Sequence, residues 1–307
     1  MMDVLSDVLS NLRLTGSLYF RSELAGPWSI GVKRIERHIR FHLLLSGSCH
    51  VAVDGMPPIQ MVPGDAVVVP HGTAHILSDM PGRPPLPLGR AMAEGGLAAN
   101  GVLRILNGRP EPDCRLLCGY CEFDGGLTHP LFATLPTLLR LRPGESWGWL
   151  EDAIRFLADD AAQGTPGLAA IASRLLEMLF IQAVRNHTER EGDTPSFMSA
   201  LADRHLSRAL EAMHANPEAD WSLERLAAIA ALSRSRFAEL FQVQLGVPPM
   251  RYLAEWRLHR ARRLLTETDL SVAEVAYRTG YSSLPAFTRR FTAAFGVGPG
   301  RFRRQAA

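Results

Sequence analysis

Between about residues 16 and 123, apolar residues occur in short runs that Gly and Pro interrupt. The runs fall at 18–20, 41–45, 49–53, 66–69 and 114–123. Short β-prone runs cut by turn residues predict the strands of a barrel or sandwich. Asp54-Gly55 and Pro63-Gly64-Asp65 are turn signals, so consecutive strands are expected to pair antiparallel. Residues 80–101 are rich in Pro, Gly and Ala and are expected to form an exposed loop.

After Pro143 the apolar spacing becomes helical. Residues 149–157 form one candidate helix, a Gly-Thr-Pro-Gly break follows at 164–167, and residues 168–184 form a second helix with apolar positions three and four apart. This pattern predicts a helical hairpin over 143–192. The apolar arc of its second arm is wide, so that arm packs against the sheet, against another chain, or both. We expect a homodimer, with Leu175 and Leu179 at the seam, and keep intrachain packing as the alternative. Residues 193–202 are then a linker.

The last hundred residues contain the same two-helix plan twice. In the first unit Ser222 caps a helix, Leu232-Ser233 turns, and a second helix over 234–245 ends at Gly246. In the second unit Ser271 and Glu274 form a capping box, Gly280-Tyr281 turns, and Ser282 or Ser283 caps a helix that reaches Phe295. A helix over 250–265 joins the units. We expect four of its side chains to face solvent or phosphate: Arg257, Arg260, Arg262 and Arg263.

Charge separates the two halves of the chain. The chain of 307 residues has a net charge of only +2, but residues 196–307 carry 16 arginines and no lysine against 10 acidic residues, a balance of +6. Arginine forks onto phosphates and guanine edges, so a polyanion is the expected partner of this half. Two helix-turn-helix units held by a rigid helix can place their second helices in successive major grooves of duplex DNA. Residues 203–307 alone are therefore expected to bind DNA in a salt-dependent way.

The C-terminal motifs resemble those of the AraC/XylS-type transcription regulators. The resemblance rests on Ala273-Glu274-Val275-Ala276, Gly280-Tyr281, Phe295-Gly296 and Pro299, and upstream on Trp256-Arg257 and Gly246. It implies promoter DNA and RNA polymerase as partners. It also implies that the exposed face of each second helix reads bases; the residues on these faces are Ser235, Ala238 and Glu239, then Leu284, Pro285, Thr288 and Arg289. We expect Arg234, Arg236 and Arg290 to grip phosphate, and a solvated helix face is the alternative for each arginine.

The N-terminal half resembles a cupin. Residues 64–75 follow the second cupin motif, in which a strand turns at Pro-x-Gly and returns with His75 pointing inward as a metal ligand. Of the first motif only His42, with His38 four residues earlier, is present, and no glutamate follows before Gly55. The incomplete ligand set argues against a metalloenzyme. A cupin oxygenase or isomerase with an attached DNA-binding module is nevertheless the alternative function.

Cysteines and histidines are the other candidate chemistry. Cys114, Cys118 and Cys121 lie on one run, and Cys49 lies on another. Three interpretations stay open: buried structural thiols, a redox or electrophile sensor, and a zinc site formed by His42, His75, Cys118 and Cys121. If the thiols are structural, the expected effector is a small apolar or aromatic molecule bounded by Trp28, Phe41 and His75.

Together these patterns predict an α+β multidomain protein. We expect a cupin-like sensor barrel over 1–142, the helical hairpin, the linker, and an all-α double helix-turn-helix domain over 203–307. The predicted function is a sequence-specific, non-enzymatic transcription regulator. The chain has no apolar run of about 18 residues, and two aspartates stand in its first seven residues, so no membrane span or signal peptide is expected and the predicted location is the cytoplasm. The effector, the operator and the sign of regulation are not predicted.

Overall fold

The structure is a computed structural model, and it describes residues 3–12, 14–94, 97, 101–123, 129–142, 144, 148, 152–153, 156, 166–191 and 194–306. The chain forms two compact units. The sheet unit comprises Leu14–Phe123 and Leu135–Arg190, and the helical unit comprises Met1–Arg13, Asp124–Thr134 and Glu191–Ala307. The helical unit thus includes two segments that the sequence pattern assigns to the sensor domain.

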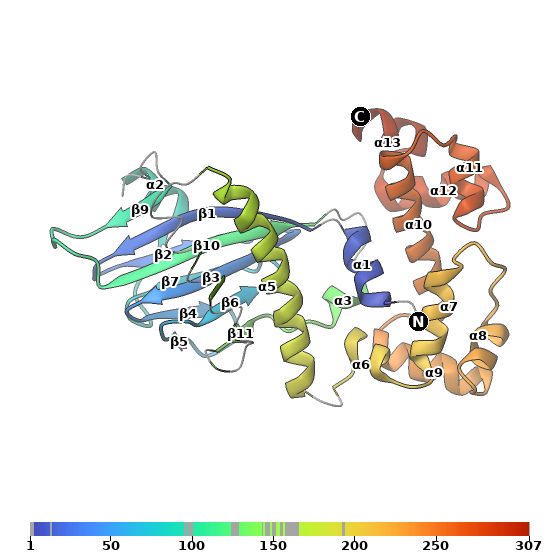
Figure 1. The fold of residues 1–307 in the computed structure, drawn as a ribbon, viewed down its shortest axis with the longest axis horizontal. Helices are drawn as coiled ribbons and strands as arrows, with labels where there is room; N and C mark the ends of the chain where they lie inside the picture. Colours follow the sequence, from blue (N-terminus) through green and yellow to red (C-terminus); the bar gives the residue numbers. More distant parts are fainter. Residues whose placement is uncertain are drawn as a thin grey trace. The chain divides into compact units, whose positions relative to one another are not determined.

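The sheet unit contains two sheets, drawn as arrows in Figure 1. The six-stranded sheet has the order β11-β6-β3-β10-β1-β9, and the five-stranded sheet has the order β5-β4-β7-β2-β8. Neighbouring strands are antiparallel except for the pairs β1–β9 and β2–β8. The strands are β1 (Thr15–Leu24), β2 (Ser29–Val32), β3 (His38–Ser46), β4 (Cys49–Val53), β5 (Ile59–Met61), β6 (Ala66–Val69), β7 (His75–Ser78), β8 (Leu86–Pro87), β9 (Val102–Ile105), β10 (Cys114–Glu122) and β11 (Leu139–Leu141).

The predicted strands are all present, but one predicted hairpin and the predicted loop need correction. Asp54-Gly55 joins β4 to β5, which pair antiparallel as predicted. The Pro63-Gly64-Asp65 turn instead carries the chain from β5 in one sheet to β6 in the other, so these consecutive strands do not pair. The segment predicted as a loop over 80–101 contains β8 and helix α2 (Leu88–Glu94).

Alternation along the central strands decides which residues enter the core. On β10, Leu116 and Cys118 face the core between the sheets, together with Leu44 of β3. Gly119 faces the other way, because a Cβ on it would lie 2.7 Å from Leu176 of helix α5 (Leu168–Glu191). Phe41 pairs with Gly119 and therefore shares that outer face. The prediction that Phe41 bounds the interior is wrong for this reason.

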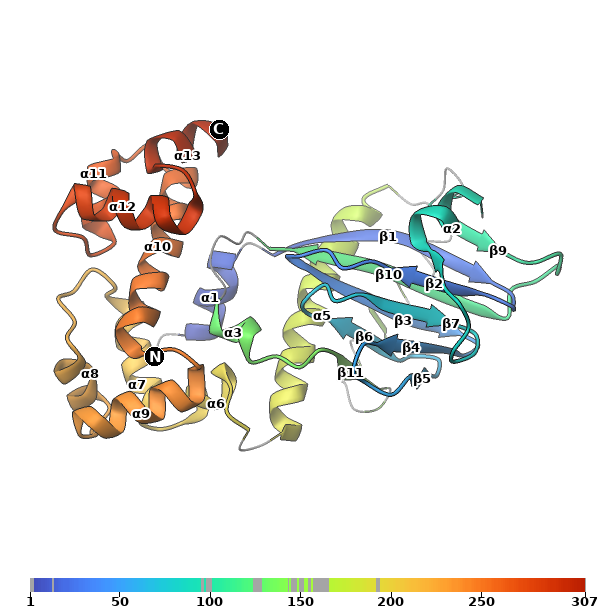
Figure 2. The same cartoon turned by 180° about the vertical axis from the view of Figure 1, so that it is seen from behind.

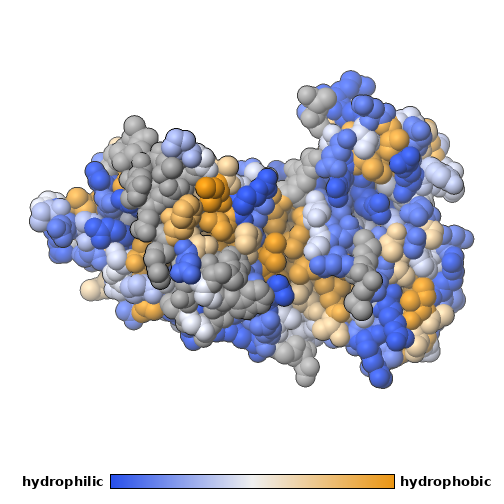
Figure 3. Space-filling view, viewed as in Figure 1, coloured by the Kyte–Doolittle hydropathy of each residue, from blue (hydrophilic) through white to orange (hydrophobic). Residues whose placement is uncertain are grey.

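Helix α5 covers the outer face of the six-stranded sheet (Figures 1 and 2). Its inward residues are buried, and Leu179, expected at a dimer seam, is 1% exposed within its own chain. Leu175 is half-buried, whereas Ile171 and Met178 are 40% and 42% exposed on the opposite side. Figure 3 shows apolar side chains at the surface along this helix. The wide apolar arc therefore serves intrachain packing through Leu179 and leaves a narrower exposed stripe. The predicted first arm, 149–157, lies largely outside the described residues.

The helical unit contains the two predicted helix-turn-helix units. The first is α8 (Leu223–Ile229) with α9 (Arg234–Leu245), the second is α11 (Val272–Arg278) with α12 (Leu284–Phe295), and α10 (Pro249–Glu267) joins them. The side chains of four serines cap these helices: Ser222, Ser233, Ser271 and Ser283. Gly246 and Gly296 end α9 and α12 in the left-handed conformation. The other helices described in this unit are α1 (Val4–Leu12), α3 (Pro130–Ala133), α6 (Phe197–Ala202), α7 (Leu206–Ala215) and α13 (Pro299–Ala306). Helix α6 lies within the predicted linker.

Two segments distant in the sequence complete the core of the helical unit. A chain of polar contacts runs from Asp7 of α1 to His214 of α7 (2.8 Å), then to Tyr252 of α10 (2.7 Å) and to His129, which caps α3 (3.4 Å). Trp256 and His259 extend this buried aromatic cluster. The contacts fasten α1 and α3 to α7 and to α10, the helix that joins the two helix-turn-helix units.

Candidate functional site

Helix α9, the second helix of the first helix-turn-helix unit and its predicted recognition helix, presents its predicted base-reading face to solvent. Ser235 and Glu239 are exposed and Ala238 is half-buried, while Phe237 and Phe241 on the opposite side are fully buried. Both arginines at its start are paired within the protein, Arg234 with Glu224 and Arg236 with Glu239, each at 3.0 Å. These ion pairs are exposed and therefore weak, so phosphate can replace the carboxylates.

The second recognition helix, α12, has the same construction. Phe287 and Phe291 anchor it, and Leu284 is 43% exposed although it is apolar. Pro285, Arg289 and Arg290 are exposed, and Thr288 is half-buried. Arg289 has no salt bridge or hydrogen bond within the described part of the chain, which leaves its guanidinium available to a guanine edge. An exposed leucine and proline at the helix start offer apolar contact, as to a thymine methyl group.

The same faces extend one turn further than the sequence analysis proposed. Gln242 follows Ala238 and Glu239 at helical spacing, and Thr292 follows Thr288 and Arg289; both are exposed. The spacing alone could have identified them. Gln242 also donates a hydrogen bond to the carbonyl of Gly246 at 2.8 Å, so its amide is partly committed to the helix end.

The linking helix α10 does not present all four of its predicted arginines. Arg257 is half-buried and donates hydrogen bonds to the carbonyls of Pro217 and Ala219. Arg262 is only 5% exposed, and its guanidinium lies 3.5 Å from the carbonyl of Asn11 in α1. The expectation that these two face solvent or phosphate is wrong, because both serve contacts inside the helical unit. Arg263 pairs with Glu267, and Arg260 is half-buried.

In the sheet unit, three of the predicted sensor residues form one polar cluster. His42 Nδ1 lies 3.2 Å from the Sγ of Cys118, and His42 Nε2 lies 2.7 Å from His75 Nε2. His75 Nδ1 lies 2.7 Å from the carbonyl of Thr73, so this nitrogen carries the proton. His42 must then donate through Nε2, and its Nδ1 accepts from the thiol. One consistent set of protons therefore satisfies the whole cluster with both imidazoles neutral.

Burial maintains these neutral forms. It lowers the pKa of His75 to about 4 and holds the pKa of His42 well below its ordinary value. Burial also raises the pKa of the Cys118 thiol to about 12. At neutral pH the cluster thus contains a thiol and two uncharged rings, and no thiolate.

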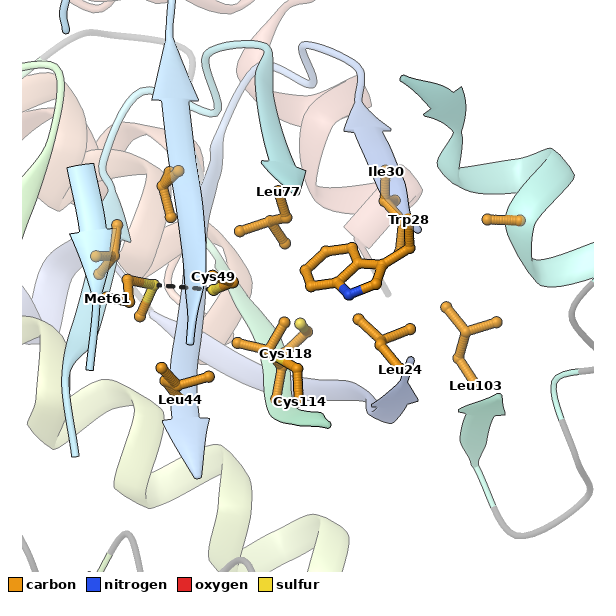
Figure 4. Packing of buried hydrophobic residues seen from close by; sticks show 14 of the residues in the cluster. Leu24, Trp28, Ile30, Leu44, Cys49, Met61, Leu77, Leu103, Cys114 and Cys118 are labelled. Carbon is orange, nitrogen blue, oxygen red and sulfur yellow. Dashed lines mark hydrogen bonds between the residues drawn. The ribbon is translucent and has the colours of Figure 1, made fainter. Parts of the chain in front are cut away.

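A small cavity adjoins the cluster. Its volume is about 20 Å³, the space of about one water molecule. Apolar side chains form most of its wall, and the polar part of the lining consists of Ser22, Arg40, His42 and Cys118. Arg40 is 3% exposed, and its guanidinium also lies 5.4 Å from the centre of the Tyr120 ring. Trp28 lies in the same core, whereas Phe41 does not (Figure 4).

The other cysteines lie in different surroundings. Cys114 faces Cys49 across the core, and Cys49 also contacts Met61 at 3.9 Å (Figure 4). The hydrogen bond to Cys114 and burial raise the pKa of the Cys49 thiol. Cys121 lies two residues after Gly119 on β10 and therefore shares its outer face. Burial, followed by the charge of Glu177, raises the pKa of the Cys121 thiol. The predicted sensor cysteines therefore do not converge.

The four candidate metal ligands do not fit a metal centre. The Nε2 atoms of His42 and His75 face each other, but Cys118 contacts the opposite nitrogen of His42. Cys121 faces away from them on the other side of the sheet. Within the described residues no group of three His, Cys, Asp or Glu side chains is placed to hold one ion.

Two helix-turn-helix units on one connecting helix, in a chain that also contains a two-sheeted unit, are the arrangement of a DNA-binding protein. Residues 3–189 match the family described as Cupin, and residues 226–305 match the family described as Helix-turn-helix domain. The HTH-type transcriptional regulator AlkR of Acinetobacter baylyi is 31% identical over 99% of this chain and 100% of its own length. A putative AraC-like transcription regulator of Streptomyces lividans is 28% identical over 99% of this chain and 98% of its own length.

The chain belongs to the AraC-type family of helix-turn-helix transcriptional regulators. Among solved structures, the DNA-binding domain of AdpA in complex with a target DNA matches 34% of this chain and 92% of its own, at 33% identity and a TM-score of 0.32. No helix in the described residues is both long and apolar enough to cross a membrane.

Proposed function

We propose that this regulator binds promoter DNA through α9 and α12 as a cytoplasmic homodimer, acts with RNA polymerase, and takes its signal from a small molecule in the sheet unit. The observation that carries the DNA-reading assignment is that α9 and α12 are built alike. Each helix exposes one face to solvent and buries a pair of phenylalanines on the opposite face. The candidate metal ligands do not converge on one point among the described residues, and we propose that the chain is not an enzyme.

A DNA-binding assay with the full chain tests this assignment. A duplex is first selected from a random-sequence pool by the wild-type protein, and affinities are then measured at several salt concentrations. Arg289→Ala removes a candidate guanine contact and should cost about 1–3 kcal/mol, with relaxed preference at one base pair. Arg208→Ala, an exposed arginine of α7, is the charge-matched control and should keep that preference. A salt-independent affinity, or equal effects of both variants, would contradict the proposal.

The cavity beside His42 supports the small-molecule signal. A mostly apolar wall with a few convergent polar groups is typical of a ligand pocket. The volume is too small for most organic molecules, so binding requires the wall to open, and such a ligand would favour one of two states of the sheet unit. We propose an effector with an apolar body and one hydrogen-bonding group that meets Arg40, His42 or Ser22.

Thermal unfolding in the presence of a library of small apolar compounds tests the pocket. A true ligand stabilises the fold by about 2.7 kcal/mol at 100 times its dissociation constant. Val32 lines the cavity, and Val32→Leu adds one methylene group to it. This variant should lose the ligand-induced shift while its unliganded stability decreases by no more than about 1–3 kcal/mol, the usual cost of one methylene group added to a core. A shift that persists in Val32→Leu would place the ligand elsewhere.

Burial of the thiols argues against the redox or electrophile signal, because the thiolate is the reactive form. The triple variant Cys114→Ser, Cys118→Ser and Cys121→Ser separates the two signals. If an oxidant changes DNA affinity in the wild type and not in this variant, the thiols carry the signal. We also propose that the chain holds no metal. Metal analysis of the purified wild-type chain tests this proposal and the alternative function as a cupin enzyme, because stoichiometric iron, manganese or zinc would contradict it.

A further inference from the structure

Arg257 lies in the middle of α10, the helix that joins the two helix-turn-helix units. Its guanidinium donates from Nε to the carbonyl of Pro217 (2.6 Å) and from Nη2 to the carbonyl of Ala219 (2.8 Å). These carbonyls belong to the loop that follows α7 and leads directly to Ser222, the cap of α8. Arg257 therefore fixes the loop that leads into the first helix-turn-helix unit.

The loop that Arg257 holds is itself well ordered by hydrogen bonds. Trp221 donates from its indole nitrogen to the carbonyl of Asn216 at 2.8 Å, and Arg225 of α8 bonds to the carbonyl of Asp220. The Arg225 guanidinium also lies 5.1 Å from the centre of the Trp221 ring. A restraint on the Pro217 and Ala219 carbonyls is therefore passed to the start of α8 rather than absorbed by a loose loop.

The other face of the same guanidinium contacts the second unit. Gly280 occupies the turn between α11 and α12 with φ of +83°, and a Cβ on it would lie 2.7 Å from both Cζ and Nε of Arg257. The next residue, Tyr281, packs against Phe287 of α12 with 5.2 Å between ring centres. The glycine therefore meets two demands, a left-handed backbone and the close approach of a guanidinium to the turn.

Burial and the neighbouring groups act on the charge of Arg257 in opposite directions. Burial lowers the pKa of Arg257, while Tyr281, Asp220 and Glu218 act in the opposite direction. Planar geometry lets one arginine donate to two carbonyls and still stack on a backbone turn, which a lysine cannot do. A phosphate contact would require the side chain to abandon both carbonyls.

We propose that Arg257 is a positioning residue that fixes the second helix-turn-helix unit relative to the first, and so sets the distance between half-sites that the protein accepts. Recognition helices in successive major grooves must lie about 34 Å apart along the duplex. If the joint between them is rigid, binding of one helix presents the other at high effective concentration, and only one spacing is accepted. If the joint is loose, this advantage and the spacing preference decrease together.

The test uses the full chain and the duplex that the wild type selects from a random-sequence pool. The same duplex is prepared with one base pair removed, with one or two base pairs added between the half-sites, and with the second half-site scrambled. The variants are Arg257→Met, which removes all donors, Arg257→Lys, which keeps the charge, and Gly280→Ala, whose methyl group displaces the guanidinium. Arg251→Met is the control on the same helix, since that side chain is exposed and pairs with Glu255.

Arg257→Met should lose about tenfold in affinity for the selected duplex but less than about twofold for the duplex with one scrambled half-site, and its preference among spacings should flatten. Arg257→Lys should fall between this variant and the wild type, Gly280→Ala should behave like Arg257→Met, and Arg251→Met should behave like the wild type. Thermal unfolding of each variant shows whether a loss of affinity comes from a destabilised fold and not from the joint between the two units. If Arg257→Met keeps the wild-type spacing preference, or loses affinity equally for the intact and the scrambled duplex, the proposal is overturned.

Discussion

Acid should destabilise the helical unit through His259, a histidine that the fold keeps uncharged. His259 is 2% exposed in α10, and neither of its ring nitrogens has a hydrogen-bond partner among the described residues. Burial, followed by the charge of Arg262, lowers its pKa to about 4 from the ordinary 6.5. The other rings of this cluster that titrate, His129 and His214, are also buried with lowered pKa values.

The sign and size of the effect follow from the difference between the folded and unfolded chains. At pH 5 the unfolded chain protonates His259 and the folded chain largely does not, so the unfolded state binds more protons and stability decreases as the pH falls. Between pH 7.5 and pH 5.0, pKa values of 6.5 and about 4 correspond to a loss of about 2 kcal/mol. The stability that neutral His259 allows is complete above pH 6.5 and is lost progressively toward pH 4.

The variant His259→Leu isolates this contribution because leucine fills the site without titrating. Urea titrations at pH 7.5 and 5.0 can be followed by fluorine NMR of fluorotryptophan, which separates Trp256 from the other four tryptophans. Trp256 lies 4.1 Å from His214 between ring centres and so reports on this cluster. The variant should lose about 2 kcal/mol less than the wild type over this pH interval. Equal losses in the two proteins would refute the assignment of an uncharged, buried His259.

Two further changes test other parts of the structure. Ala231 has φ of +52° in the turn of the first helix-turn-helix unit, where the second unit has Gly280, so Ala231→Gly should stabilise the fold by about 0.5–1 kcal/mol and raise the midpoint of thermal unfolding. If the exposed stripe of α5 joins two chains, Ile171→Glu with Met178→Glu should give a folded monomer by sedimentation, whereas Leu179→Glu should unfold the sheet unit because it places a charge in the core.

Local signals predicted the recognition helices well because capping is a short-range interaction. Ser271 with Glu274 and the glycines at 246 and 296 determine where helices begin and end from within a few residues. The exposed faces then follow from helical spacing around Phe237 and Phe287. The same is true of the hairpin at Asp54-Gly55, whose turn and strands are contiguous.

The structure differs from the sequence predictions where long-range packing decides the position of a side chain. The orientation of Phe41 depends on its pairing with Gly119, almost eighty residues away, and Arg257 and Arg262 look like surface arginines until their carbonyl partners are known. The sequence identified His42, His75 and Cys118 as candidates but could not predict their contacts, because three different strands supply them. Which nitrogen faces the thiol decides whether these residues fit a metal, and no sequence spacing encodes that.

The contacts of α1 and α3 bear on the expectation that residues 203–307 bind DNA alone. The chain passes between the two compact units four times, and residues 1–13 and 124–134 belong to the helical unit. A fragment over 203–307 lacks Asp7 and His129, which leaves His214 and Tyr252 without two of their partners and exposes the aromatic cluster around Trp256.

We therefore expect the fragment to unfold at a lower temperature than the helical unit of the full chain and to bind DNA more weakly. The salt dependence should be unchanged, because all sixteen arginines of residues 196–307 lie within the fragment. Differential scanning calorimetry and salt-dependent titration of both proteins measure this, and a fragment as stable as the full chain would show that α1 and α3 contribute little to the DNA-binding core.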